Sequence, residues 1–179
     1  KVGQLRKIGP VLDYCLVGHM GEGKNVELVI EAFIELYKRG SKAQITFYGG
    51  SEERLAELQN QYDLPPTIHF KGIVNEVPYH LHQCYLSASY TELFANACVE
   101  ALNQGLLALL SDVDIAHRFY AGQSNAINLF KTKSELIQKI EKMEQPGFYL
   151  LNEKNLALAS RYSLEKIAQI YRELLDRNF

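Results

Sequence analysis

The feature that most constrains the fold is a regular alternation of short apolar, β-branched or aromatic runs with longer segments of helical periodicity. This alternation is typical of βαβ units, in which crossover helices join parallel strands. The short runs predict strands at residues 14–17, 43–48, 67–70, 84–88, 106–110 and 126–130. The sequence therefore predicts an α/β fold: one doubly wound, Rossmann-like layer around a parallel sheet of about six strands.

The segments between these runs carry apolar residues at helical spacing. One helix is predicted to begin at Val26 and to end before Gly40, because Lys38 and Arg39 put positive charge in its last turn and Gly40 suits the position after it. Further helices are predicted at residues 52–62, 77–82, 96–104, 114–120, 134–143, 148–160 and 163–176. The terminal helix, within 163–178, follows the complete sheet and is a candidate to pack on a second domain.

Length and charge exclude several classes of protein. The 179 residues suffice for one domain with a self-supporting core, and 47% hydrophobic with 22% charged residues excludes a disordered chain. A formal net charge of −2 without a run of like charge argues against nucleic acid as a partner. The longest apolar stretch, 106–110, is far short of the ~20 residues of a membrane span. Because Lys1 opens the chain, we expect a domain of a longer protein.

The cysteines predict no metal site and no disulfide. Cys15, Cys84 and Cys98 are odd in number, far apart and set among apolar neighbours, which is typical of buried thiols in a reducing compartment. His80, His82 and Cys84 form a His-x-His-x-Cys run, but this spacing matches no standard zinc site and lacks a fourth ligand.

A glycine-rich stretch follows the first predicted strand: Gly18-His19-Met20-Gly21-Glu22-Gly23-Lys24-Asn25. Ligands of doubly wound sheets bind at the C-terminal ends of the strands, so this stretch is expected to line a site. Glycines let the backbone approach an anion at a helix start, and Lys24 would share that anion. A solvated lysine beside a flexible turn is the alternative.

The same stretch raises a remote alternative, a P-loop NTPase. Gly18, Gly23 and Lys24 have the spacing of the phosphate-binding loop, and Asp112 follows an apolar run as a magnesium-binding acid would. That loop needs Ser or Thr after its lysine to hold Mg²⁺, and Asn25 has no hydroxyl.

Two glutamates follow the fourth predicted strand with seven residues between them. Glu92 falls in the loop after the strand, and Glu100 lies about one turn into the next helix. Both carboxylates could reach a ligand across the crevice, and their oxygens accept hydrogen bonds from the paired hydroxyls of a ribose or a hexose. The alternative is that both glutamates are surface acids beside an amphipathic helix. For Glu100, whose neighbours in the sequence are apolar, this alternative is the less favoured one.

Taken together, these motifs resemble the C-terminal, donor-nucleotide-binding domain of a GT-B fold glycosyltransferase of glycosyltransferase family 4. The resemblance covers nearly the whole chain, and residues 1–179 are expected to form this single domain. Five motifs carry it: Val-Gly-x-x…Lys at 17–24, Phe-Tyr-Gly-Gly at 47–50, Phe-x-Gly-x-Val at 70–74, Glu-x7-Glu with Glu-Ala-x-x-x-Gly at 92–105, and Tyr-Ser-x-x-x-Ile-Ala-x-x-Tyr at 162–171.

The resemblance implies a retaining enzyme that moves a sugar from a UDP-, GDP- or ADP-sugar to an acceptor, with no metal and no cofactor. It implies that Lys24 neutralises the diphosphate, that Glu100 holds the ribose, and that Glu92 contacts the sugar. Lys24 and Glu92 would be the catalytic residues. The implied donor-binding positions are His19, Lys24, Gly49, Val74, Phe94, Ala95, Asn96 and Glu100, with the turns at Gly49 and Val74 beside the base.

The acceptor would be a saccharide, a lipid or a protein, recognised by an N-terminal domain absent from this chain. The isolated domain is therefore expected to be inactive. The resemblance also implies a cytoplasmic protein, either free or resting on the inner face of the membrane.

The chain departs from the family pattern at three places. His19 stands where an arginine is usual, so diphosphate binding would be weaker or pH-dependent. Glu92-Leu93-Phe94-Ala95 replaces Glu-Gly-Phe-Gly, and Val113-Asp114-Ile115 replaces a glycine pair. These losses motivate a second hypothesis, a noncatalytic glycosyltransferase-like partner or scaffold. Retention of the lysine and both glutamates favours the active transferase.

Overall fold

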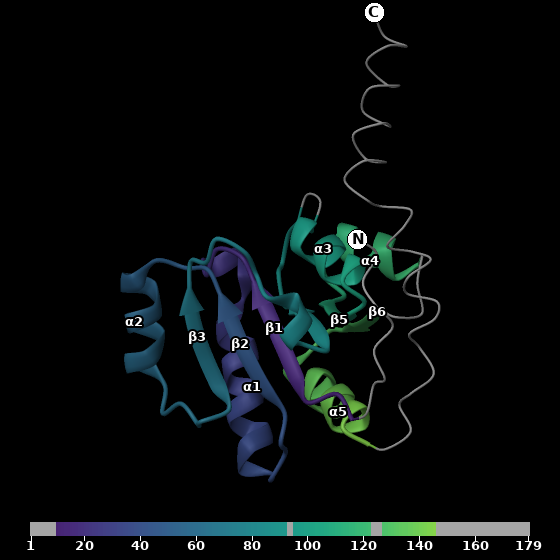
Figure 1. Ribbon diagram of the computed structural model, residues 1–179. Coiled ribbons are helices and arrows are strands. Elements are labelled where there is room, and N and C mark those ends of the chain that lie inside the picture. Colours follow the sequence, from purple (N-terminus) through teal and green to yellow (C-terminus); the bar gives the residue numbers. More distant parts are fainter. Residues whose placement is uncertain (1–9, 93–94, 123–126, 146–179) are drawn as a thin grey trace, which may run out of the picture.

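The computed structural model describes residues 10–92, 95–122 and 127–145 (Figure 1). Its strands are β1 (Asp13–Val17), β2 (Gln44–Tyr48), β3 (Ile68–Gly72), β4 (Cys84–Ser87), β5 (Leu107–Ser111) and β6 (Ile127–Phe130). They form one parallel sheet in the order β3-β2-β1-β4-β5-β6. This is the strand order of the dinucleotide-binding fold, and it confirms the predicted Rossmann-like α/β architecture.

The helices are α1 (Val26–Lys38), α2 (Glu52–Gln61), α3 (Asn96–Asn103), α4 (Ile115–Ala121) and α5 (Lys133–Met143). Two short 3₁₀ turns, η1 (Glu22–Lys24) and η2 (Tyr79–Leu81), lie in loops. The helix predicted at 77–82 is therefore wrong. Pro78 has no amide hydrogen and disfavours helical backbone at the residue before it, and β4 begins too soon afterwards for a helix to grow. The helices predicted at 148–160 and 163–176 lie outside the described residues.

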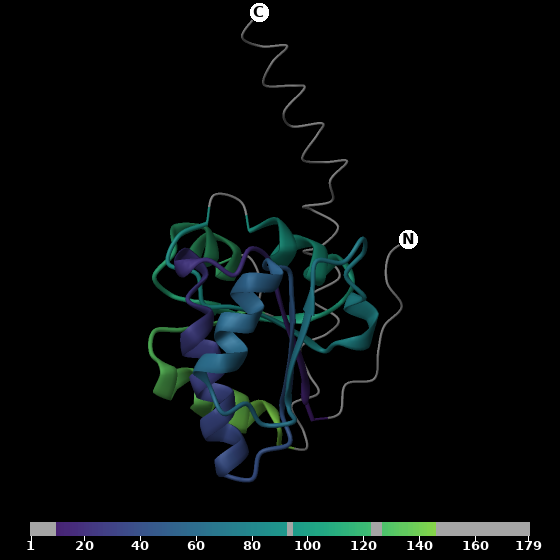
Figure 2. The ribbon, with the colours of Figure 1, turned by 90° about the vertical axis from the view of Figure 1, so that its left-hand side faces the viewer.

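Helices cover both faces of the sheet and bury two apolar cores. One core lies under α1, α2 and α5, and the other lies under α3 and α4 (Figure 1). Successive strand residues point to opposite faces, so Tyr14 and Leu16 enter the first core and Cys15 enters the second. Figure 2 turns α2 and the edge strand β3 toward the viewer. The three cysteines are buried free thiols, as predicted.

Three glycines with positive φ turn the chain at the C-terminal ends of neighbouring strands. These are Gly18 after β1, Gly49 after β2 and Gly72 at the end of β3. The Gly18 amide donates to the Tyr48 carbonyl at 3.0 Å, and the Gly49 amide donates to the Gly72 carbonyl at 2.6 Å. Backbone hydrogen bonds thus hold the three turns together beneath the candidate site.

Candidate functional site

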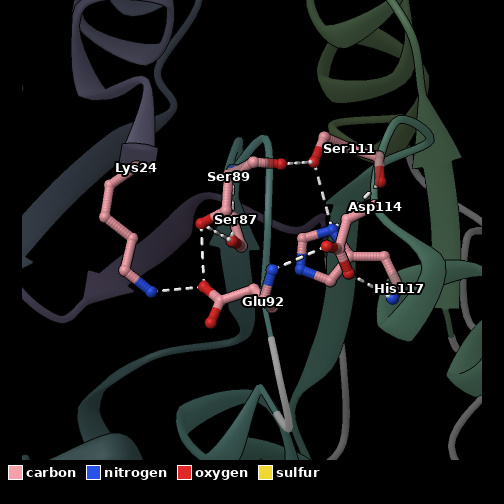
Figure 3. Close-up of polar contacts among 7 residues, drawn as sticks. All are labelled: Lys24, Ser87, Ser89, Glu92, Ser111, Asp114 and His117. Atoms are coloured by element: carbon pink, nitrogen blue, oxygen red, sulfur yellow. Dashed lines mark hydrogen bonds and ion pairs between the residues drawn. The ribbon is translucent and has the colours of Figure 1, made fainter. Parts of the chain in front are cut away.

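The candidate site lies where the loops after β1, β4 and β5 meet (Figure 3). β1 is flanked by β2 on one side and by β4 on the other, so the direction of winding reverses between β1 and β4. Such a switch point opens a crevice at the C-terminal ends of the strands. The amide of Tyr90, in the loop after β4, donates to the Gly23 carbonyl at 2.9 Å and ties two of the three loops together.

Lys24 and Glu92 form an ion pair across this crevice (Figure 3). The ammonium donates to Oε1 of Glu92, and the Ser89 hydroxyl donates to the same oxygen at 2.8 Å. The Glu92 side chain is 14% exposed and that of Lys24 is 26% exposed. Because both groups are largely withdrawn from water, their attraction is screened less than in a pair on the open surface.

A buried polar cluster lies beside this pair, made of Ser87, Ser89, Ser111, Asp114 and His117 (Figure 3). Burial lowers the pKa of His117 below its ordinary value, so the ring is neutral at pH 7. Nδ1 of this ring lies 3.0 Å from the Ser111 carbonyl, which can only accept a hydrogen bond. Nδ1 therefore carries the ring proton.

No member of this cluster is among the site residues that the sequence predicts. Four members do lie in the stretches after predicted strands, 87–96 and 111–114, where functional residues are expected: Ser87, Ser89, Ser111 and Asp114. His117 lies inside α4, where its spacing looks like that of an ordinary helical residue. Only the folded position of α4, which follows β5 and packs beside β6, brings its ring to Ser111 at the end of β5.

A first pocket, of about 720 Å³, surrounds the Lys24–Glu92 pair. Its volume is in the range of pockets that hold small-molecule ligands. The N-terminal turn of α3 forms one wall. The lining residues are Val17, Gly18, Lys24, Tyr85, Thr91, Glu92, Ala95, Asn96 and Ala97.

A second pocket, of about 430 Å³, contains Glu100 and Val74. Oε2 of Glu100 accepts a hydrogen bond from the Tyr79 hydroxyl at 3.0 Å. The other lining residues are Asn75, Glu76, Val77, Tyr79, Asn103 and Gln104. Helix α3 joins the two pockets, because its first turn lines the first and Glu100, one turn on, lines the second. One helical turn advances about 5.4 Å, so a single elongated ligand can reach both.

The structure brings most, but not all, of the predicted site residues to these pockets. His19 is exposed and lines neither pocket, and its ring lies over Gly21. Gly49 packs beneath the Gly18 carbonyl as part of the support of the loop. Phe94 lies outside the described residues.

Ala95 stands where the family pattern has a glycine, and it adopts a left-handed backbone conformation just before α3. Its φ and ψ are 41° and 46°, which is the left-handed conformation that glycine adopts without cost. The alanine therefore keeps a left-handed turn at the start of α3, at a cost of about 1 kcal/mol.

Replacing Ala95 by glycine is expected to leave the free energy of unfolding unchanged or to raise it by up to about 1 kcal/mol. Relief of the left-handed strain favours the folded state, and the larger entropy of unfolded glycine offsets part of that gain. Ala101→Gly is the matched control inside α3, where the same change should destabilise by about 1 kcal/mol or more. Urea titration compares the two variants; similar destabilisation by both would contradict the strain at Ala95.

The residue suggested as a magnesium ligand is engaged elsewhere. Asp112 pairs with Arg118 at 2.8 Å and with Lys131 at 3.4 Å, and the hydrogen bond from Arg118 holds the pKa of this carboxyl below its ordinary value. Within residues 10–92, 95–122 and 127–145, no three His, Cys, Asp or Glu side chains gather as a metal site would require. Across the same ranges, no helix has the length and apolar character needed to cross a membrane.

The strand order is that of a Rossmann-like domain, and the fold matches that of solved GT-B glycosyltransferases. The model of the family described as glycosyl transferases group 1 matches residues 5–158, and the chain belongs to this family. This family membership replaces the alternative that the chain is a P-loop NTPase. Assignment to glycosyltransferase family 4 stays a prediction.

Three comparisons illustrate the relationship. The chain is 25% identical over 175 residues to alpha-monoglucosyldiacylglycerol synthase of Acholeplasma laidlawii, an alignment of 91% of this chain and 44% of that protein. Anabaena Alr3699/HepE, solved with UDP and glucose, has a TM-score of 0.79 at 18% identity over 93% of this chain and 48% of its own. Sucrose-phosphate synthase from Thermosynechococcus elongatus has a TM-score of 0.75 at 20% identity over 93% and 46%. The chain thus spans about half, or less, of the proteins it matches.

Proposed function

We propose that this chain binds the nucleotide-sugar donor of a retaining glycosyltransferase. The observation that carries the proposal is the pair of pockets along α3, one holding Lys24 beside Glu92 and the other holding Glu100. A nucleotide-sugar is elongated and has a sugar, a diphosphate and a ribose in sequence. The two pockets offer a cation for the diphosphate and carboxylates for the hydroxyls on either side of it.

Each charged residue has a role in this proposal. The bond between the sugar and the diphosphate breaks during transfer, and the leaving nucleoside diphosphate gains negative charge. The Lys24 ammonium and the start of α3 stabilise that charge. The Glu92 carboxylate accepts hydrogen bonds from the sugar, and Glu100, oriented by Tyr79, accepts them from the ribose.

The ion pair between Lys24 and Glu92 means that a diphosphate must compete with Glu92 for the lysine. The ammonium donates to the Glu92 carboxylate in the first pocket. A bound diphosphate brings further negative charge, and the ammonium then lies between the phosphates and the carboxylate. Glu92 therefore weakens the affinity for a bare nucleoside diphosphate while it strengthens contact with the sugar.

We propose that a second, N-terminal domain holds a saccharide, lipid or protein acceptor over the first pocket, since this chain matches only 44% of the length of the Acholeplasma relative. The name of the Acholeplasma relative contains a diacylglycerol, which favours a lipid acceptor and peripheral association with the inner face of the membrane. No cofactor and no metal takes part in the proposed reaction.

Thermal unfolding with nucleotides tests donor binding. UDP, GDP and ADP, with their sugar conjugates, are each added with and without Mg²⁺. At ten times its dissociation constant, a ligand stabilises the folded state by about 1.4 kcal/mol, which raises the midpoint by a few degrees. We expect a magnesium-independent shift with one base. No shift with any nucleotide at millimolar concentration would contradict the proposal and favour a noncatalytic partner.

Glu100→Gln is expected to weaken the binding of that nucleoside diphosphate by about tenfold, since a charged acceptor of the ribose hydroxyls is lost. The 2′,3′-dideoxy form of the same nucleotide is the matched control, because it has no hydroxyl to donate. Its affinity should be low for the original chain and should not fall further in the variant. Calorimetric titration measures all four affinities. An equal loss for both nucleotides would place the role of Glu100 away from the ribose.

A further inference from the structure

We propose that Asp114 is a positioning residue that sets the place of Glu92 in the first pocket; this rests on the proposed role of Glu92 as a contact of the donor sugar. Asp114 does not line that pocket. It lies in the loop between β5 and α4, and it acts on Glu92 through the backbone (Figure 3).

The carboxylate of Asp114 joins two elements with its two oxygens. Oδ2 accepts the Glu92 amide hydrogen at 2.6 Å, and Oδ1 accepts the His117 amide hydrogen at 3.0 Å. The second contact caps the N-terminus of α4, and the first fastens the loop after β4 to that cap. Asp114 is only 4% exposed, so water competes weakly for these hydrogen bonds.

A second set of hydrogen bonds, through Ser111, joins the same two loops and limits how far Glu92 can move. The Ser111 hydroxyl donates to the Ser89 carbonyl, and the protonated Nδ1 of His117 donates to the Ser111 carbonyl. Ser89 in turn donates to the Glu92 carboxylate at 2.8 Å. Asp114 thus holds Glu92 at its backbone, and Ser89 holds it at its side chain.

This arrangement gives a physical meaning to one departure from the expected pattern. Asp114 falls in the Val113-Asp114-Ile115 segment, where a glycine pair was expected. A glycine could neither cap α4 through a side chain nor accept the Glu92 amide hydrogen. In this chain the carboxylate supplies both contacts, so the position of Glu92 depends on the loop after β5.

Serine and alanine at position 114 separate the two roles of the carboxylate. Serine is as good a helix cap as aspartate, but its single short hydroxyl cannot also reach the Glu92 amide. Alanine loses both contacts. Asp114→Ser should therefore keep the amides of α4 protected from hydrogen exchange, whereas Asp114→Ala should expose the first turn of that helix.

The first readout does not depend on any ligand. Exchange of the Glu92 amide hydrogen, followed by NMR, should be faster by about tenfold in Asp114→Ser, since a charged hydrogen-bond acceptor is lost. The exchange of the Leu109 amide, in the middle of β5, is the internal control and should not change. An unchanged exchange rate at Glu92 would show that Asp114 does not hold the Glu92 backbone, and it would overturn the proposal.

The second readout measures the consequence for the sugar. Calorimetric titration with UDP, GDP, ADP and their glucose conjugates gives, for the base that binds, the ratio of conjugate to diphosphate affinity. This ratio should fall severalfold in Asp114→Ser while the diphosphate affinity stays within about twofold. An unchanged ratio would overturn the positioning role. If the original chain binds none of these nucleotides, the proposed function and this role fail together. The hydrogen-exchange rates still test whether Asp114 holds the Glu92 backbone.

Discussion

Replacing Lys24 by alanine is expected to weaken the binding of the nucleoside diphosphate by about 100-fold. A charge-assisted contact to the diphosphate contributes about 1.5–3 kcal/mol, and its removal also leaves Glu92 unpaired beside the incoming negative charge. The corresponding nucleoside, which has no phosphate, should bind Lys24→Ala as it binds the original chain. Calorimetric titration with both ligands measures the difference, and an equal loss for the two would remove the proposed role of Lys24.

Glu92→Gln is the most informative variant to compare with Lys24→Ala, because it is expected to strengthen the binding of the nucleoside diphosphate and not to weaken it. Glutamine keeps the shape of the side chain but removes the negative charge that pairs with the Lys24 ammonium. The bare diphosphate should then bind several times more tightly, while the sugar conjugate loses affinity relative to it. Weaker binding of the diphosphate would contradict the competition described above.

Lys133→Ala is the control for general loss of positive charge. The Lys133 ammonium pairs with Glu31 at 2.9 Å, on the helices α5 and α1, away from both pockets along α3. Its removal changes the net charge as Lys24→Ala does. Nucleotide affinity should stay within about twofold at 0.15 M salt, where exposed distant charges are screened.

Replacing Gly49 by alanine is expected to destabilise the fold by about 4 kcal/mol, which lowers the unfolding midpoint by about 10 °C. The φ of Gly49 is 105°, and a Cβ atom there would lie 2.3 Å from the Gly18 carbonyl oxygen. The left-handed backbone costs about 1–2 kcal/mol, and the clash with backbone adds overpacking that no side chain can relieve. The Gly18 loop carries Lys24, so the pocket would deform as well.

Gly40→Ala, compared with Gly49→Ala, separates the cost of the left-handed backbone from the cost of the steric clash. Gly40, just after α1, also has a positive φ, 84°, but a Cβ atom there meets nothing within 4 Å. This variant should lose only about 1 kcal/mol from backbone strain. Calorimetric unfolding compares the two. Equal destabilisation would show that the close approach of Gly49 to Gly18 contributes nothing.

Local pattern was enough to predict the strands and the order of the elements. The strands end within one or two residues of their predicted bounds, because buried strands need short apolar runs wherever they occur. The helix predicted at 77–82 is wrong because Pro78 disfavours helical backbone and β4 begins soon afterwards, at Cys84. The sequence predicts Lys24, Glu92 and Glu100 as site residues because the ends of parallel strands are the places where such sheets bind ligands.

Local pattern along the chain accounts for the alternation of strands and helices, the turns at glycines, and the charged residues that follow β1 and β4. These features depend on neighbours in the sequence. The folded arrangement is needed to place Glu100 in a separate pocket from Lys24 and to bring Asp114 to the backbone of Glu92. The contact between Glu92 and Asp114 spans 22 residues, and it exists because β4 and β5 pair side by side and bring their loops together. Strand pairing is set by the packing of the whole sheet, which no local spacing of residues specifies.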